Sequence, residues 1–355
     1  MGIKNFYKFL QKYSPESFIK RKIGDYSGKT LGVDANLILY TFLKKNINYL
    51  LKINNGNIND NIDSYEMFYY HLMEMVLCSY KNNIKLLMVF DGKTPDIKKG
   101  TVFDRKIERE KAKNELKEMN EIIDEDISLD DEKKKKDLLI KTVHLNSKLI
   151  KSVKEILGYC GIPCIDAPYE ADTQLAYLSK NNYIDGIISN DFDNLTFGGK
   201  KIILDFFGYK NDYFKPVIEL DLENILKNLQ INYDTFVELC ILMGSDYSDK
   251  PQYSYEYIFN LLKQHGNYNN IPEKNEFKLP ENLDIEHIKK YFKYPEIDEY
   301  NQEKYVQLKF FSFEENNIIE FLNKHKKLIF NDRYYNNLLG AMKRILFFTI
   351  LKNKR

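Results

Sequence analysis

Residues 186–200 read GIISNDFDNLTFGGK, and this stretch joins an apolar run to two acids. The apolar residues end in a Ser-Asn pair, which leads into Asp191 and Asp193, one residue apart. A short apolar run bounded by polar residues is typical of a strand buried on both faces. The sequence therefore predicts a buried strand at 184–188 that ends beside two carboxylates.

Two earlier runs share this design. Residues 30–33 (TLGV) precede Asp34, and residues 86–90 (LLMVF) precede Asp91. Continuous apolar strands are typical of parallel sheets that helices cover on both faces. Ligands of such sheets bind beyond the carboxyl ends of the strands, and the acids fall there. We therefore expect one clustered site rather than separate solvated acids.

Helical patterns separate the predicted strands, so strands and helices alternate along the chain. This alternation predicts an α/β fold with a central, mostly parallel sheet flanked by helices. The expected elements are helices at 65–80, 148–159, 222–229, 233–243, 255–264, 313–330 and 333–351, and a further strand at 201–207.

Composition narrows the possible partners. Lys and Arg total 53 and Asp and Glu total 52, so a nucleic acid would have to be met by a local basic patch. The four cysteines form no CxxC pair, which indicates neither a zinc site nor a disulfide framework. No apolar run approaches the roughly 20 residues of a membrane span, and we expect neither a membrane partner nor a signal peptide.

Two further places add acids. Glu170 and Asp172 follow Pro168 in the first turn of a predicted helix, and Asp246 follows Gly244. Acids in a first turn interact favourably with the helix dipole, which would explain one of them without a function. The candidates for one site are therefore Asp34, Asp91, Glu170, Asp172, Asp191, Asp193 and Asp246.

So many carboxylates stay ionised at close range only if cations balance them, because like charges raise one another's pKa. Oxygen ligands without His or Cys favour Mg²⁺ or Mn²⁺. Two such ions about 3.5 to 4 Å apart can hydrolyse a phosphodiester with water as nucleophile.

An Asp-x-Asp after a strand also occurs in phosphatases that form an aspartyl-phosphate. Neither a P-loop nor a GxGxxG pattern accompanies these acids.

The segment between Asp91 and Lys148 has a different character. Residues 98–120 are rich in Lys, Arg and Glu, and residues 124–137 run from acids into four lysines. Charge runs are usually solvated helices or partly disordered insertions. We expect an inserted helical arm at about 92–147, called the arm below.

Together these segments resemble the flap endonuclease family, the structure-specific 5′ nucleases that also include exonuclease 1 and the xeroderma group G protein. The resemblance implies a nuclease core at 1–266, built from segments 1–110 and 140–266 around the arm, and a C-terminal helical extension at 267–355. EENNIIEFL and FNDRYYNNLLGAMKR extend the likeness to about residue 345. The matching stretches, in the family's order, are MGIKNFYKFL, LGVDANLILY, VFDGKTPDIKKGTVFDR, GIPCIDAPYEADTQLAYL, IISNDFDNLTFGG and FVELCILMGSDY.

The resemblance also implies roles for residues of the site. The seven acids would hold two Mg²⁺ ions, with Mn²⁺ as a substitute, and Asp191 would be essential to catalysis. Lys98 and Arg105 correspond to a lysine and an arginine that position the scissile phosphate. Because seven residues span about two helical turns, these two would share a face, which Arg109 continues. The alternative for all three is an exposed cation on a charged helix.

Two more residues match DNA-binding positions of the family. Tyr40 corresponds to a stacking tyrosine, and stacking on an aromatic ring tolerates any base. Its alternative is a core tyrosine in a helix that follows a strand. The resemblance places Gly2 near the site if Met1 is removed.

The chain departs from the family in two places. The family has a glycine-rich turn in a helix-turn-helix that grips duplex phosphates and binds K⁺, whereas residues 248–266 read SDKPQYSYEYIFNLLKQHG. Backbone amides approach phosphate closely only past small residues, so K⁺ binding and duplex anchoring are in question here. The C-terminal LFFTILKNKR lacks the family's sliding-clamp peptide, and recruitment by that peptide is not expected.

The predicted function is a metal-dependent 5′-flap endonuclease or 5′-3′ exonuclease that acts on branched or 5′-ended DNA in replication, repair or recombination. One alternative is a 5′-3′ RNA exonuclease, which would differ in its response to the 2′-hydroxyl. Another is a branched-DNA-binding module without catalysis, which would lack acids or arm cations. We expect a monomer located in the nucleus, or in the cytoplasm if the chain is viral.

Overall fold

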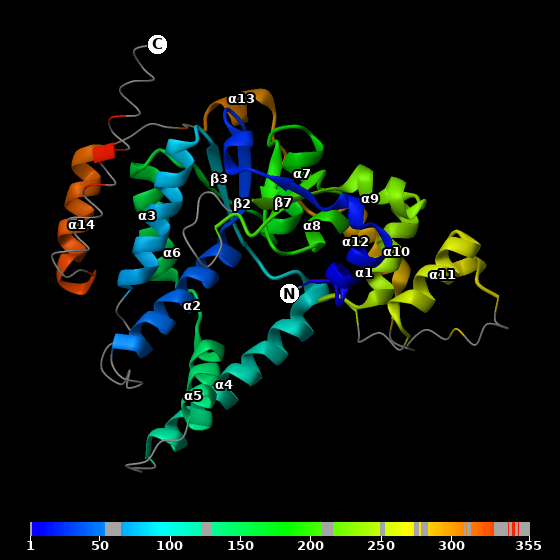
Figure 1. Cartoon of the computed structure of the whole chain (residues 1–355), viewed down its shortest axis with the longest axis horizontal. Coiled ribbons are helices and arrows are strands. Elements are labelled where there is room, and N and C mark those ends of the chain that lie inside the picture. Colours follow the sequence, from blue (N-terminus) through cyan, green and yellow to red (C-terminus); the bar gives the residue numbers. More distant parts are fainter. Residues whose placement is uncertain are drawn as a thin grey trace.

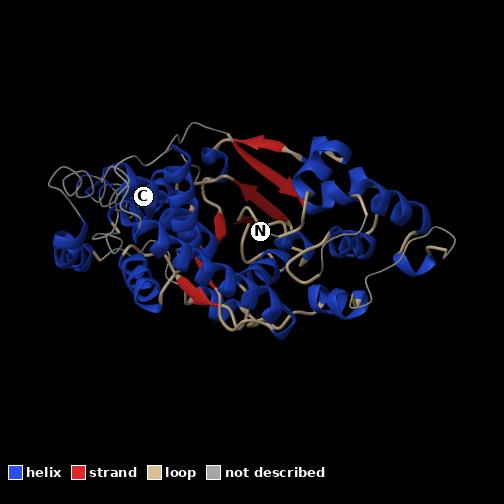
Figure 2. Ribbon diagram, turned by 90° about the horizontal axis from the view of Figure 1, so that it is seen from below, coloured by secondary structure: helices blue, strands red, loops and turns tan. Residues whose placement is uncertain are grey.

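The computed structural model describes residues 2–53, 65–121, 129–207, 216–248, 253–272, 277, 283–308, 310, 314–329, 340, 343–344 and 347. These residues form a seven-stranded sheet with helices on both faces (Figure 1, Figure 2). The strands are β1 (Ile19–Arg21), β2 (Thr30–Asp34), β3 (Lys85–Phe90), β4 (Cys164–Asp166), β5 (Gly186–Ile188), β6 (Lys201–Leu204) and β7 (Val217–Asp221).

The strand order is β1-β7-β6-β5-β2-β3-β4, and β7 alone runs against its neighbours. The predicted α/β class with a mostly parallel sheet is therefore confirmed. The register aligns the carboxyl ends of the central strands: Asp34 lies opposite Val89, and Val33 lies opposite Ile188. The acids that follow these strands consequently emerge at one edge of the sheet.

Apolar residues on the two sides of β3 belong to two separate cores. In β3, Leu86, Met88 and Phe90 face one core, while Leu87 and Val89 face the other. All five are buried, as the uninterrupted apolar run predicts. The period of two residues explains how one strand serves both layers.

The first core packs the sheet against α2 (Ala35–Ile53), α3 (Glu66–Lys81), α6 (Ser147–Tyr159) and α14 (Glu315–Ile329), which lie together in Figure 1. None of the described helices is both long and apolar enough to cross a membrane. The opposite core packs the sheet against α1 (Phe6–Tyr13), α7 (Ala171–Lys180), α8 (Asp193–Thr196), α9 (Leu222–Leu229), α10 (Tyr233–Met243), α11 (Tyr255–His265) and α12 (Ile285–Lys293). The short helix α13 (Gln302–Val306) follows α12.

The arm consists of α4 (Lys99–Glu121) and α5 (Leu129–Thr142), which project from the body as a pair (Figure 1). A single 3₁₀ turn, Asp96–Lys98, leads into α4. The two arm helices share a small apolar cluster made of Ala112, Leu116, Leu138 and Leu139, and Ile47 and Tyr49 of α2 pack against it. The charge-rich segment is therefore a helical hairpin over its described part.

Several elements differ from the sequence prediction. Strand β6 stops at Leu204 instead of residue 207, because Asp205 has a left-handed backbone (φ 55°) and its N–H bonds to the Asn190 side chain at 2.9 Å. Strands β1, β4 and β7 are too short or too mixed in polarity to stand out in the sequence. The helix predicted at 333–351 lies outside the continuously described residues.

Gly92 fixes the distance between the end of β3 and the loop before α7. Its N–H bonds to the Tyr169 carbonyl at 2.6 Å, and a Cβ at this position would lie 2.1 Å from the Ala167 carbonyl oxygen. A side chain here must push apart two backbone segments, which cannot yield as a flexible side chain would.

We expect Gly92→Ala to lower the free energy of unfolding by about 1–3 kcal/mol, the usual cost of overpacking. Gly158→Ala is the matched control, because Gly158 is exposed in α6 and a Cβ there meets nothing within 4 Å. Removing a helical glycine should raise stability by about 0.5–1 kcal/mol. Urea denaturation of both variants measures the difference; equal stabilities would contradict the prediction.

Candidate metal centre

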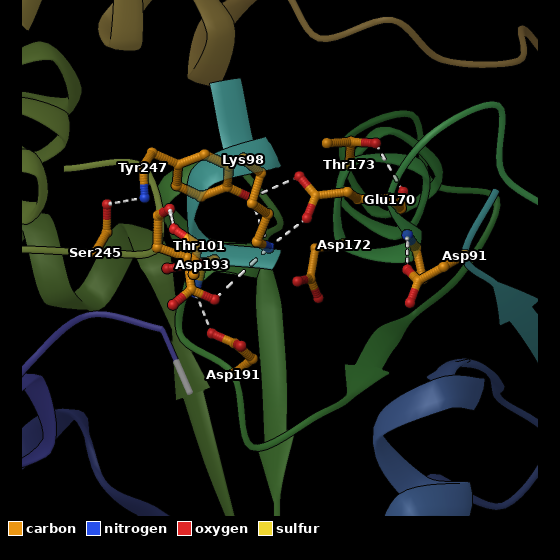
Figure 3. Close-up of polar contacts among 12 residues, drawn as sticks. Asp91, Lys98, Thr101, Glu170, Asp172, Thr173, Asp191, Asp193, Ser245 and Tyr247 are labelled. Carbon is orange, nitrogen blue, oxygen red and sulfur yellow. Dashed lines mark hydrogen bonds and ion pairs between the residues drawn. The ribbon is translucent and has the colours of Figure 1, made fainter. Parts of the chain in front are cut away.

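Five segments of the chain bring acids to one cavity of about 450 Å³ at the carboxyl edge of the sheet. Figure 3 shows most of these acids, which come from the ends of β2 and β3, the loop after β5, the start of α7 and the loop after α10. The predicted residues that line the cavity are Asp34, Tyr40, Asp91, Lys98, Arg105, Arg109, Glu170, Asp172, Asp191 and Asp246.

Hydrogen bonds fix the acids that follow the two central strands. The backbone N–H of Leu37 donates to Asp34 at 3.0 Å. The carboxylate of Asp91 accepts from the Asn36 amide at 2.6 Å and from the backbone N–H of Ala171 at 2.9 Å. Asp91, which follows β3, is thereby tied to α2 and α7 at the cavity wall.

The loop after β5 folds back on itself around Asp191. Its carboxylate accepts from the backbone N–H of Asp193 at 3.1 Å, so the two acids lie side by side. The Asn194 amide donates to Asp172 at 2.5 Å and joins this loop to α7. Both carboxylate oxygens of Asp193 are buried and have no hydrogen-bond partner among the described residues.

Lys98 supplies the positive charge closest to the acids. Its Nζ pairs with Glu170 and lies 3.7 Å from Asp246, in contact with the ring of Tyr247 (Figure 3). Arg105, two helical turns further on, pairs with Asp246 at 2.6 Å. Both cations therefore reach Asp246, although Lys98 lies in the 3₁₀ turn before α4 and not in the helix itself.

Burial and mutual repulsion disfavour the ionised acids. Burial, followed by the charge of the neighbouring Asp91, raises the pKa of Asp34 to about 8. Burial also raises the pKa of Asp91 and Asp191. For Asp172 and Asp193 burial is again the main cause, with Asp191 next, and their pKa values lie well above the ordinary range.

Glu170 has a different setting from the other acids. It is the residue immediately before α7, so the expectation that it sits within the first turn is wrong by one position. Its Oε2 accepts hydrogen bonds from the hydroxyls of Tyr247 at 2.7 Å and Tyr291 at 2.9 Å. The ammonium of Lys98 holds the other oxygen, Oε1.

The residues predicted to touch DNA lie around the same site. Tyr40 and Arg109 line the cavity. Gly2 has φ 83°, and a Cβ there would lie 2.0 Å from an oxygen of Asp191, so its backbone runs directly against the acids. The structure thus gathers every predicted site residue, although Gly2 and Asp193 lie beside the cavity and do not line it.

Sequence reasoning did not single out four neighbours of the acids. Asn36 lies two residues after Asp34, and Asn194 follows Asp193, so an amide next to an acid motif was an available signal. Tyr247 stands inside the GSDY motif. Tyr291 lies between the helices predicted at 255–264 and 313–330, where no sequence pattern connects it to the site.

The donor set fits hard divalent cations. Carboxylates supply it, and neither His nor Cys lines the cavity among the described residues. Asp193 also presents two buried oxygens without hydrogen bonds, which a cation would satisfy. No three His, Cys, Asp or Glu side chains on the described chain are gathered closely enough to hold one ion as they stand. The ammonium of Lys98 lies between two of the acids, Glu170 and Asp246.

Comparison with known proteins gives consistent matches. Residues 1–112 match the XPG N-terminal domain, and residues 161–246 match the XPG I-region. Flap endonuclease 1 of Cryptosporidium parvum is 31% identical over 363 residues, which cover 97% of this chain and 70% of that protein.

Solved structures show the same fold. The catalytic core of Rad2 in complex with DNA substrate has a TM-score of 0.69 at 22% identity, covering 95% of this chain and 99% of that one. Flap endonuclease-1 from Methanococcus jannaschii has a TM-score of 0.65 at 22% identity, with coverage of 94% and 97%. The predicted sheet flanked by helices is therefore that of these catalytic cores.

The raised pKa of Asp34 predicts a pH-dependent stability. Between its ordinary pKa near 4 and the folded value of about 8, the folded protein binds a proton that the unfolded chain releases. In EDTA, the free energy of unfolding should therefore fall as pH rises from 5 to 8, by up to about 1.4 kcal/mol per pH unit for one group.

Asp34→Asn should flatten this slope, because the amide does not titrate. Asp104→Asn, an exposed change in the arm, should leave it as in the wild type. Denaturant titrations at pH 5, 6, 7 and 8 give the slopes. An Asp34→Asn slope equal to that of the wild type would refute the assignment.

Proposed function

The chain belongs to the flap endonuclease family of structure-specific nucleases, and on that premise we propose that it hydrolyses branched DNA at or near 5′ ends with divalent metal ions. One active site of this kind could catalyse both the cleavage of a 5′ flap and the removal of nucleotides from a 5′ end. The observation that carries the proposal is the meeting of acids from five segments with two arm cations at one cavity.

We assign the metal ions to the acids. Asp34, Asp91, Glu170, Asp172, Asp191, Asp193 and Asp246 would hold two Mg²⁺ ions, or Mn²⁺ in their place. Bound there, such ions supply an activated water and neutralise charge on the leaving oxygen. Burial and then mutual repulsion raise the pKa of several of these acids, which supports the assignment, because bound cations relieve the repulsion.

The arm cations would act on the phosphate. Lys98 and Arg105 are charged groups already aimed at the acids, and a phosphate between them and the site would meet fixed positive charge where negative charge develops. Arg109 continues this line along α4, at the cavity wall. Tyr40 offers its ring to a base near the scissile bond, and the backbone of Gly2 can approach the DNA without a side chain.

DNA is the partner that this arrangement favours. The Rad2 core above was solved with a DNA substrate, and its fold is that of this chain. We propose a nuclease core at 1–266 with the arm at 92–147 inserted, an extension at 267–355 that packs on it, and a monomer working on nuclear DNA. Recruitment by a sliding-clamp peptide and K⁺ binding at 248–266 form no part of the proposal.

Asp191→Asn should reduce cleavage of a labelled 5′-flap substrate in Mg²⁺ by at least about 100-fold, because a metal ligand loses its charge. DNA affinity, measured by fluorescence anisotropy in Ca²⁺, should change little. Asp234→Asn is the control, since it removes the same charge from the surface of α10.

The substrate panel contains 5′-flap, nicked, 5′-ended and RNA duplexes. A wild-type protein that binds branched DNA and cleaves nothing in Mg²⁺ or Mn²⁺ would favour the binding module. Preference for RNA would favour the RNA exonuclease.

Arg105→Ala should lower kcat by roughly 10- to 1,000-fold, in the range lost when one preorganised charge donor is removed. Lys106→Ala removes a positive charge from the adjacent, exposed position of α4 and should have little effect on kcat. Single-turnover rates on the flap substrate test the pair. Equal losses in both variants would show that the arm contributes only general charge.

A further inference from the structure

One hydrogen bond at the site comes from the C-terminal extension. Tyr291 lies in α12, 121 positions after Glu170 in sequence, yet its hydroxyl is 2.9 Å from the Oε2 of that acid. The neighbouring Tyr247 donates to the same oxygen at 2.7 Å. Two hydroxyls of independent origin therefore converge on one carboxylate oxygen.

This convergence gives the two oxygens of Glu170 different tasks. Oε2 has a donor for each of its two lone pairs, so it is saturated and the plane of the carboxylate is set. Oε1 faces the ammonium of Lys98 (Figure 3). Of the two oxygens, Oε1 is thus the one that can exchange its partner for a metal ion while the group keeps its orientation.

The helix that carries Tyr291 is firmly seated. Its neighbour Phe292 is fully buried, with its ring 4.7 Å from that of Phe197 and 5.0 Å from that of Tyr247. Lys289, one turn earlier, pairs with the buried Glu238 of α10. The ring of Tyr291 itself lies edge-on against Phe197 at 5.7 Å. The hydroxyl is therefore presented by a packed ring on an anchored helix.

We propose that Tyr291 is a positioning residue for the metal centre, which orients Glu170 so that Oε1 faces the ions. The C-terminal extension then completes the metal site instead of only covering the core. This inference rests on the proposed metal-dependent nuclease function. Outer partners of metal-binding carboxylates typically change metal affinity or activity by 10- to 100-fold when removed.

Tyr291→Phe tests the hydroxyl alone, because the ring and its contacts remain. Mn²⁺ binding, followed by the EPR signal of the free ion, should weaken about tenfold, and half-maximal cleavage should need correspondingly more Mg²⁺. Tyr233→Phe is the matched control, since it removes a hydroxyl that donates at 2.6 Å to the Thr196 carbonyl and does not touch an acid. Its Mn²⁺ affinity should equal that of the wild type.

A double-mutant cycle separates positioning from a general loss of structure. In a Glu170→Gln background, Tyr291→Phe should weaken Mn²⁺ binding less than twofold, because the group that it orients is no longer a carboxylate. An equal loss in both backgrounds would overturn the proposal. So would a wild-type affinity in Tyr291→Phe.

The two proposals fail in different ways. A wild-type protein that cleaves flaps, with a Tyr291→Phe variant that binds Mn²⁺ normally, overturns the role of Tyr291 and leaves the nuclease. A wild-type protein that cleaves no nucleic acid, yet binds Mn²⁺ in a Tyr291-dependent manner, overturns the nuclease and leaves the positioning role.

Discussion

Repulsion among carboxylates buried at one edge of the sheet is the constraint on which the rest of the structure depends. Burial and proximity raise the pKa of Asp34, Asp172 and Asp193. The fold therefore holds together ionised groups whose free energy would fall if they moved apart or took up protons. The parallel register that aligns the strand ends prevents their separation. Lys98 then supplies compensating charge from the base of the arm. The sheet, the helices that begin at its carboxyl edge and the arm thus all contribute to balancing the charge of the same acids.

The sequence predicted the parts of this arrangement that depend on residues close together in the chain. Uninterrupted apolar runs indicated strands buried on both faces, and an acid after each run indicated the carboxyl edge. The seven-residue spacing of Lys98 and Arg105 predicted that both would point the same way, and both lie near Asp246, although Lys98 belongs to the 3₁₀ turn before α4. These inferences hold because strand burial and helix periodicity are short-range properties.

Other parts could not be predicted because they depend on contacts distant in sequence. The end of β6 is set by Asn190, which bonds to the backbone of Asp205 across the sheet edge. Strand β7, whose sequence mixes apolar and acidic residues, pairs with a neighbour on each side, and its own pattern does not indicate a strand. Tyr291 reaches Glu170 through the packing of α12 on α10, and no local pattern in its own segment points to an acid. Side-chain neighbours of a site are a tertiary property, and even a correct list of acids omits them.

The small apolar cluster of the arm has a consequence for the motions of the molecule. Ala112, Leu116, Leu138 and Leu139 form a core separate from the two that flank the sheet, and the residues packed against it, Ile47, Tyr49 and Met119, are only partly buried. Opening this hairpin exposes far less apolar surface than disrupting the sheet, so the free energy of local opening lies well below that of global unfolding. Amide protons in α4 and α5 will therefore exchange with solvent ahead of those in β2 and β3. Lys98 and Arg105 lie where the arm, which opens at low free energy, meets the acids at the edge of the sheet, which opens at high free energy.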